Sequence, residues 1–273
     1  MTKPKAESDG TSPILRNKDA AAESVFTPEA LLREARRQKG IALKAIPPVC
    51  ILDPDGDMVR QVRRKHGGHL HPGWACYHTE MIAFERDGIE YGMIGCAVGA
   101  SFATLIAEEL FASGCELLLS MTSAGQILPL QNPPYFIVID RALRDEGTSY
   151  HYLPAAPFSE ADTRIVILAE KALAGGEFQV RTGASWTTDA PFRETAAAIK
   201  AAGQQGILAV EMEAAALYAF AKARGRSVLC LAHVTNQMGQ IEGDFEKGVA
   251  DGAEESLRLI SLIARRWRAV KRP

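Results

Sequence analysis

Glu211 and Glu213 stand one residue apart where a buried strand is predicted to pass into an alanine-rich helix. The apolar run at residues 206–210 predicts the strand, and residues 212–224 predict the helix, which Gly225 ends. The helix dipole stabilises acidic side chains near a helix N-terminus. The two glutamates cannot share a helical face, because side chains two positions apart diverge.

One of the two carboxylates should therefore point to the sheet edge where α/β proteins bind ligands. A carboxylate there can accept hydrogen bonds from two neighbouring hydroxyls, as on a ribose. The alternative is an ordinary solvated glutamate at a helix start. The residues alone leave both readings open.

Two loops that follow predicted strands have features of anion sites. In residues 53–60, Gly56 lets the backbone approach a ligand, the next helix offers free N–H groups, and Arg60 lies one turn further on. A plain turn with a surface arginine fits the same residues. Residues 96–101 are small and precede a helix, but they lack both glycine-rich nucleotide motifs.

Three further segments carry polar or aromatic groups. Ser123 lies in a hydroxyl-rich loop after a buried strand, where it could donate to phosphate oxygens or to water, or simply finish the strand. Asn236 ends another strand and could present its amide to a heterocyclic base or form a turn. Phe192 and Arg193 could stack on a base and hydrogen-bond to it. A dense polar and aromatic patch occupies residues 144–152.

Strands and helices alternate along the chain, which predicts a three-layer α/β/α domain around a mixed sheet. Predicted strands cover residues 49–52, 77–86, 89–96, 117–121, 136–142, 178–182, 207–210 and 228–234. The Asp87-Gly88 turn predicts that the strands at residues 77–86 and 89–96 form a hairpin. Predicted helices cover residues 28–40, from about 58, 102–112, 159–173, 212–224 and 250–268. Residues 1–25 are polar and are predicted to be a mobile extension, and residues 26–273 to form one domain.

Composition excludes several functional classes. The net charge of -2 gives no general attraction to nucleic acid or to a membrane surface. The longest apolar runs are too short for a membrane span, and the polar N-terminus does not read as a signal peptide. The five cysteines lack metal-type spacing, and no His/Asp/Glu cluster suggests a metal site. We expect a cytoplasmic protein without a metal.

Taken together and in order, these segments resemble the nucleoside phosphorylase family, which includes the purine nucleoside and uridine phosphorylases. Residues 211–214 match the ribose-binding motif E-M-E-[AS], and residues 56–60 are similar to the phosphate-binding motif G-D-P-x-R. Residues 144–151 resemble the uridine phosphorylase pattern R-x-D-G-A-S-x-H. The resemblance runs over residues 49–267, most of the chain.

The resemblance implies roles for particular residues. Gly56, Arg60 and Ser123 would bind phosphate. Met212 would lie against the ribose, and Glu213 would accept hydrogen bonds from its 2′ and 3′ hydroxyls. Phe192, Arg193 and Asn236 would bind the base. Glu213, Arg60 and Asn236 would then be the catalytic residues of a reaction in which phosphate attacks the anomeric carbon and releases the base.

The chain departs from the family pattern at both ends of that site. Ser120 stands where the family phosphorylases carry an arginine, and an arginine contributed by a neighbouring subunit is missing near Tyr77 or His78. These losses favour hydrolysis, and residues 120–125 also resemble the T-G-S-A-G loop of methylthioadenosine and S-adenosylhomocysteine nucleosidases. Asn236 replaces an aspartate that protonates purines, and an amide cannot act as a general acid. This second departure favours pyrimidines.

We therefore expect a pyrimidine-leaning nucleoside phosphorylase that uses inorganic phosphate as co-substrate and no other cofactor. Hydrolysis of the same bond is the alternative, and a non-catalytic nucleoside-binding protein is a third hypothesis. The resemblance also implies a homodimer or homohexamer.

Overall fold

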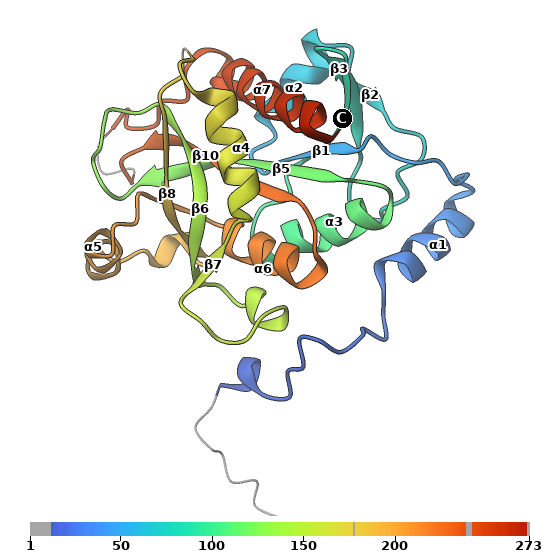
Figure 1. Cartoon of the computed structure of the whole chain (residues 1–273), viewed down its shortest axis with the longest axis horizontal. Coiled ribbons are helices and arrows are strands. Elements are labelled where there is room, and N and C mark those ends of the chain that lie inside the picture. Colours follow the sequence, from blue (N-terminus) through green and yellow to red (C-terminus); the bar gives the residue numbers. More distant parts are fainter. Residues whose placement is uncertain (1–11, 177, 239–241, 272–273) are drawn as a thin grey trace, which may run out of the picture.

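The computed structural model describes residues 12–176, 178–238 and 242–271, which form a mixed sheet flanked by helices (Figure 1). The ten-stranded sheet has the order β10-β6-β8-β9-β5-β1-β4-β3-β2, and β7 pairs with β6. Its strands are β1 (Val49–Asp53), β2 (His69–Leu70), β3 (Ile82–Arg86), β4 (Ile89–Gly95), β5 (Leu117–Gln126), β6 (Tyr135–Asp145), β7 (Phe158–Glu160), β8 (Val180–Thr188), β9 (Ala209–Glu211) and β10 (Val228–Asn236).

One part of this sheet closes on itself. Strand β5 pairs with β9 and also, in parallel, with β10. The path from β10 through β6, β8, β9 and β5 therefore returns to β10. Strands β1 and β4 extend parallel to β5 beyond the closed part. The carboxyl ends of β1, β4, β5 and β10 therefore meet at one edge, where α/β sheets bind ligands.

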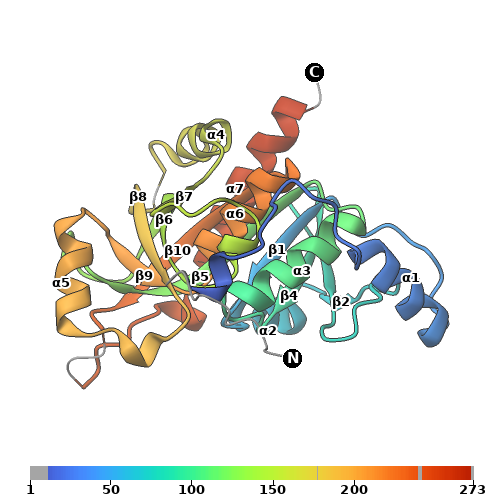
Figure 2. The same cartoon turned by 90° about the horizontal axis from the view of Figure 1, so that it is seen from below.

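Helices cover both faces of the sheet. Helices α3 (Ala100–Ala112) and α6 (Ala214–Arg224) pack on one face, and α2 (Asp57–Lys65), α4 (Thr163–Leu173) and α7 (Ala253–Lys271) on the other (Figures 1 and 2). Helix α1 (Pro28–Lys39) lies beside α3, and α5 (Ala196–Gln204) covers the end of the closed part. The predicted three-layer α/β/α architecture is confirmed.

Local sequence signals explain several of the element ends. The Thr27 side chain accepts from the Ala30 N–H at the start of α1, and Gly225 ends α6 with a φ of 61°. The predicted hairpin is confirmed: β3 and β4 pair antiparallel with Arg86 opposite Ile89.

Some predicted boundaries were wrong. Residues 158–160 form strand β7 against β6, so the helix predicted from residue 159 begins only at Thr163, after the N-cap Asp162. The helix predicted from residue 212 begins at Ala214, because Glu213 is its N-cap. The helix predicted from residue 250 begins at Ala253, since Ala250 and Asp251 have positive φ angles. Helix α5 was not predicted.

The N-terminal segment has contacts with the body of the protein. Residues 13–15 form a short 3-10 helix, and Lys18 Nζ lies 2.8 Å from His151 Nδ1. The segment runs from this contact along one side of the molecule to α1 (Figure 1). The predicted mobility of residues 1–25 stays a prediction, and residues 1–11 lie outside the described part. No helix among the described residues is long and apolar enough to cross a bilayer.

Candidate functional site

Glu211 is a structural acceptor at the end of β9. It accepts hydrogen bonds from Ser185 Oγ at 2.9 Å and Thr187 Oγ1 at 2.5 Å, and from the backbone N–H groups of Glu213 at 2.7 Å and Ala214 at 2.8 Å. Burial raises the pKa of Glu211, and these four donors act to lower it. The carboxylate thus satisfies the free N–H groups of α6 and joins it to β8. Glu211 is therefore occupied in holding α6 against β8.

Glu213 lies at the sheet edge, as the second carboxylate was expected to. The backbone N–H of Gly99, at the start of α3, donates to Glu213 Oε1 at 2.7 Å. The N–H of Met212 lies 3.3 Å from Glu213 Oε2, and Met212 itself is half-buried. No cation among the described residues pairs with this carboxylate.

The environment of Glu213 disfavours its charge. Burial, followed by the nearby Glu211 carboxylate, raises the pKa of Glu213 to about 8, although the Gly99 N–H and the Thr122 hydroxyl act to lower it. Hydroxyl groups that donate to the carboxylate favour its ionised form. The site is therefore suited to a ligand that brings hydrogen-bond donors, such as a vicinal diol.

Gly56 and Arg60 come together in the turn between β1 and α2. Gly56 has a φ of 75° and forms the N-cap of α2. A Cβ at this position would lie 2.8 Å from Cys96 Sγ and 3.0 Å from Arg60 Nη1, so only glycine fits the turn and its neighbours. The Arg60 side chain is about half exposed, with a side-chain exposure of 55%.

The donors at this end are already held by carboxylates. Asp55 accepts from the Ser123 N–H at 3.1 Å and from the Ser123 hydroxyl. Asp57 accepts from Arg60 and, at 2.7 Å, from Lys247 Nζ, which also lies 3.6 Å from Asp55. We call Asp55, Asp57, Arg60, Ser123 and Lys247 the nucleophile-end cluster, because it contains Arg60 and Ser123, which were expected to bind the attacking phosphate. Two carboxylates balance two cations in it, so its net charge is zero.

Neighbouring groups add no positive charge to this cluster. His233 is buried beside it and stacks on Phe136 with ring centroids 4.7 Å apart. Burial, and then the charge of Lys247, lowers the pKa of His233 to about 4, so its ring is neutral at pH 7. Partial burial opposes the charge of Lys247, but Asp57 and Asp55 raise its pKa, so it stays an ammonium ion.

The proposed base ligands are not gathered in the same way. The Asn236 side chain closes a local turn: its Oδ1 accepts from the Met238 N–H at 2.9 Å, and its Nδ2 lies 3.2 Å from Thr235 Oγ1. Phe192 and Arg193 lie on a short 3-10 helix and are exposed, with Phe192 at 97%. Their base-binding role stays a prediction.

The polar patch at residues 144–152 supports itself. Arg144 is buried and donates to Ser149 Oγ at 2.8 Å and to the carbonyls of Pro154 and Leu153. The N–H of Gly147 donates to Asp189 at 2.8 Å, which ties the patch to the loop before Phe192. Arg144 thus positions the backbone of this patch, and its guanidinium has few N–H donors left for a ligand.

Sequence reasoning missed several residues of the site. Gly99 lies in a loop that was singled out, but its bond to Glu213 requires α3 and α6 to pack together. Asp55 was also in a named loop without a role. No sequence motif pointed to Lys247, because it lies far along the chain, shortly before α7. Thr187 links Glu211 to the Ala215 N–H at 2.9 Å and likewise depends on tertiary packing.

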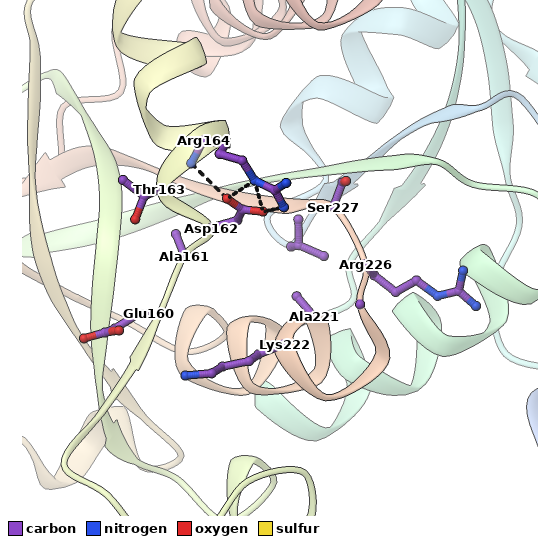
Figure 3. A pocket seen from close by; sticks show the side chains of 11 residues that line it. Glu160, Ala161, Asp162, Thr163, Arg164, Ala221, Lys222, Arg226 and Ser227 are labelled. Atoms are coloured by element: carbon purple, nitrogen blue, oxygen red, sulfur yellow. Dashed lines mark hydrogen bonds and ion pairs between the residues drawn. The ribbon is translucent and has the colours of Figure 1, made fainter. Parts of the chain in front are cut away.

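A separate pocket of about 400 Å³ lies at the amino end of β10, opposite the site (Figure 3). Asp162 and Arg164 face one another in it, with the Arg164 Nη2 2.6 Å from the Asp162 carboxylate. Asp162 also accepts the Arg164 N–H at the start of α4. The Asp162 carboxylate is therefore occupied in capping α4 and in pairing with Arg164, so we assign this pocket no role in the chemistry.

Known proteins are similar to this chain in sequence and in fold. A guanosine phosphorylase from Halorubrum lacusprofundi is 26% identical over 204 residues, 67% of this chain and 83% of that protein. A solved AMP nucleosidase from Bacteroides thetaiotaomicron has a TM-score of 0.71 at 20% identity, covering 90% of this chain and 100% of that chain. A uridine phosphorylase from Vibrio fischeri has a TM-score of 0.68 at 20% identity, covering 80% and 90%.

A purine nucleoside phosphorylase from Toxoplasma gondii has a TM-score of 0.69 at 18% identity, covering 82% of this chain and 93% of that chain. Solved relatives at this level of identity establish the fold alone. The sequence pattern of the Phosphorylase superfamily matches residues 48–265, most of the chain. With the fold and the glutamate pair in agreement, this chain belongs to the phosphorylase superfamily.

Proposed function

We propose that this protein cleaves the N-glycosidic bond of a nucleoside and that water is its nucleophile. The observation that carries the proposal is Glu213, a buried carboxylate without a cation partner among the described residues, held by the Gly99 N–H at 2.7 Å. Such a group suits the 2′ and 3′ hydroxyls of a ribose, which supply the missing donors. Met212, beside it and half-buried, would lie against the sugar.

The neutral nucleophile-end cluster favours water over phosphate. Phosphate carries up to two negative charges and needs uncommitted donors, but Ser123 and both cations already serve Asp55 and Asp57. Water needs only an acceptor for its proton. Asp55, with 33% of its side chain exposed beside Ser123, provides one.

The proposed step balances without a cofactor. The water oxygen bonds to C1′ as the C1′–N bond breaks, and the bonding electrons leave with the base, which is then protonated by solvent. Asp55 accepts the proton of the attacking water. Positive charge develops on the sugar, and the ionised Glu213 close to it stabilises that charge.

Asn236 bears on which base the protein accepts. We retain the pyrimidine preference, because Asn236 cannot donate a proton as a general acid to a purine nitrogen. Phe192 and Arg193 are exposed and would have to close over the base. We also propose that the protein is cytoplasmic and that it forms a homodimer or homohexamer. Light scattering on the purified protein would test the oligomeric state.

Phosphorolysis is the second candidate, and specific observations favour it. Gly56 and Arg60 lie in one turn at the start of α2, and Ser123 contacts Asp55 in the same cluster, so all three residues could reach one phosphate. A similar curated protein is a guanosine phosphorylase. In this case phosphate would displace Asp55 from Ser123, and Lys247 would supply one of the missing positive charges.

A nucleoside panel with and without phosphate separates these functions. Uridine, cytidine, inosine, guanosine and adenosine are incubated with the protein, and free base, ribose and ribose 1-phosphate are measured. We expect base and free ribose at equal rates with and without phosphate. Base release that requires phosphate and yields ribose 1-phosphate would establish the second candidate. Binding without any base release would support the non-catalytic hypothesis.

A further inference from the structure

Asp55 holds the donors that an incoming anion would need. One of its carboxylate oxygens accepts both the N–H of Ser123, at 3.1 Å, and the Ser123 hydroxyl. Lys247 Nζ lies 3.6 Å from the same oxygen. A backbone N–H, a hydroxyl and an ammonium group around one oxygen resemble the surroundings of a bound phosphate oxygen.

Outside this cluster, the Asp55 side chain has no hydrogen bond or ion pair among the described residues. About one third of its side chain is exposed, and its side-chain partners among the described residues are Ser123 and Lys247. By contrast, Asp53 in the same turn is buried and accepts the Val59 N–H inside α2 at 2.8 Å. Because Asp53 supports the turn, the Asp55 carboxylate is not needed for that purpose and can interact with Ser123 and Lys247.

The charge of Asp55 affects whether a phosphate anion can bind at the cluster. With Asp55 ionised, the cluster is neutral, and a phosphate anion would lie against two carboxylates. Removing the Asp55 charge leaves a net positive cluster and weakens the hydrogen bonds that hold both Ser123 donors. Like charges repel more strongly where solvent is partly excluded, so the Asp55 carboxylate decides whether the anion binds.

We propose that Asp55 selects the nucleophile: its carboxylate takes the position of a phosphate oxygen, excludes inorganic phosphate and leaves water as the attacking group. The effect on product rests on the proposed function. The effect on phosphate affinity does not, because binding is measured without any nucleoside.

The test replaces Asp55 with asparagine, which keeps the size of the side chain and removes its charge. Phosphate binding to the full-length protein is followed by isothermal titration calorimetry and by the rise of the melting temperature with added inorganic phosphate. We expect Asp55→Asn to bind phosphate at least about tenfold more tightly than the wild type. Equal affinities in the two proteins would overturn the proposal.

Two control variants give the result its meaning. Glu116→Gln makes the same change in net charge at the opposite end of β5, where Glu116 pairs with Lys271, and its phosphate affinity should equal that of the wild type. Adding Ser123→Ala to Asp55→Asn should reverse much of the gain. A gain that Glu116→Gln reproduces, or that survives Ser123→Ala in full, would overturn the proposal. Asp55→Ser provides the same test if the asparagine variant does not fold.

The product assay links this selection to turnover. In wild-type protein the expected sugar product is ribose, and in Asp55→Asn ribose formation falls while ribose 1-phosphate appears with added phosphate. There the phosphate oxygen bonds to C1′, the C1′–N bond breaks and its electrons leave with the base. If the wild type cleaves no nucleoside, the proposed function fails, but the phosphate affinities still decide the role of Asp55.

Discussion

The sugar end and the nucleophile end of this site are built on different principles. At the sugar end, Glu211 and Glu213 are buried, and they are held by backbone N–H groups and hydroxyls without a cation. At the nucleophile end, Asp55 and Asp57 are partly exposed, and they are paired with Lys247 and Arg60. The first arrangement is rigid, whereas the second can exchange partners with water, ions or ligands.

The chain can therefore change its chemistry more readily at one end of the site than at the other. Removing a buried carboxylate leaves several N–H groups unsatisfied, which costs stability as well as function. Exchanging a carboxylate in a solvated ion cluster alters charge at a smaller structural cost. Under the proposed function, sugar recognition is therefore the part of the site that is costly to alter, and the choice of nucleophile is the part that a single substitution can change.

The largest expected effect is at Glu213. Glu213→Gln removes the charge that accepts both ribose hydroxyls, and kcat/KM should fall about 10³-fold, as expected for two charge-assisted hydrogen bonds. Steady-state base release measures this loss. A 2′-deoxynucleoside should be a poorer substrate for the wild type but should lose little further in the variant. Unchanged product formation by Glu213→Gln would disprove the role of Glu213 in ribose binding.

Glu211 should matter most for stability. Glu211→Ala leaves the N–H groups of Glu213 and Ala214 and two hydroxyls without an acceptor, so the free energy of unfolding should fall by about 2–4 kcal/mol. Asp57→Ala, at the nucleophile end, should cost less, because its cationic partners Arg60 and Lys247 are partly exposed and can be solvated. Urea denaturation of both variants makes the comparison. Equal losses would show that the two ends do not differ in rigidity.

The pH profile should report the raised pKa of Glu213. In the proposed function the ionised carboxylate is the form that binds ribose. Because the pKa of Glu213 is about 8, kcat/KM should rise about tenfold from pH 6.5 to 7.5 and level off above pH 8. A profile that is flat over this range would contradict the assignment.

The same shift makes Glu213 destabilising at alkaline pH. The folded protein keeps a proton on Glu213 between the ordinary pKa of 4.5 and about 8, so this contribution to stability is present at low pH and lost as pH rises through 8. Glu213→Gln should therefore be more stable than the wild type at pH 8.5 and should lose this advantage near pH 4.5. Melting temperatures at both pH values test the sign.

The smallest expected effect is at Lys247. If water is the nucleophile, Lys247→Met should reduce phosphate-independent base release by less than about tenfold, because the lysine only balances the charge of Asp55 and Asp57. If phosphate is the nucleophile, Lys247 contacts it, and the loss should exceed tenfold and appear mainly in the KM for phosphate. Initial rates at several phosphate concentrations distinguish the two.

Much of the fold was predictable because its signals are local. The Asp87–Gly88 turn, the Gly225 helix end and the buried runs of β1, β5 and β10 each follow from neighbouring residues. Strand β7 and the true start of α4 were not predictable, because residues 158–160 become a strand only by pairing with β6. Three residues with no periodicity of their own carry too little local information.

Residue types and their spacing were enough to identify the family pattern, the glutamate pair near a helix start and the glycine turn before Arg60. These depend on residue types a few positions apart, where chain geometry leaves few arrangements. The tertiary structure alone decided that Gly99 holds Glu213, that Asp55 occupies the donors of Ser123, and that Lys247 balances the cluster. Those contacts join segments far apart in the chain, and the charge that results from them, rather than any single residue, bears on the choice between water and phosphate.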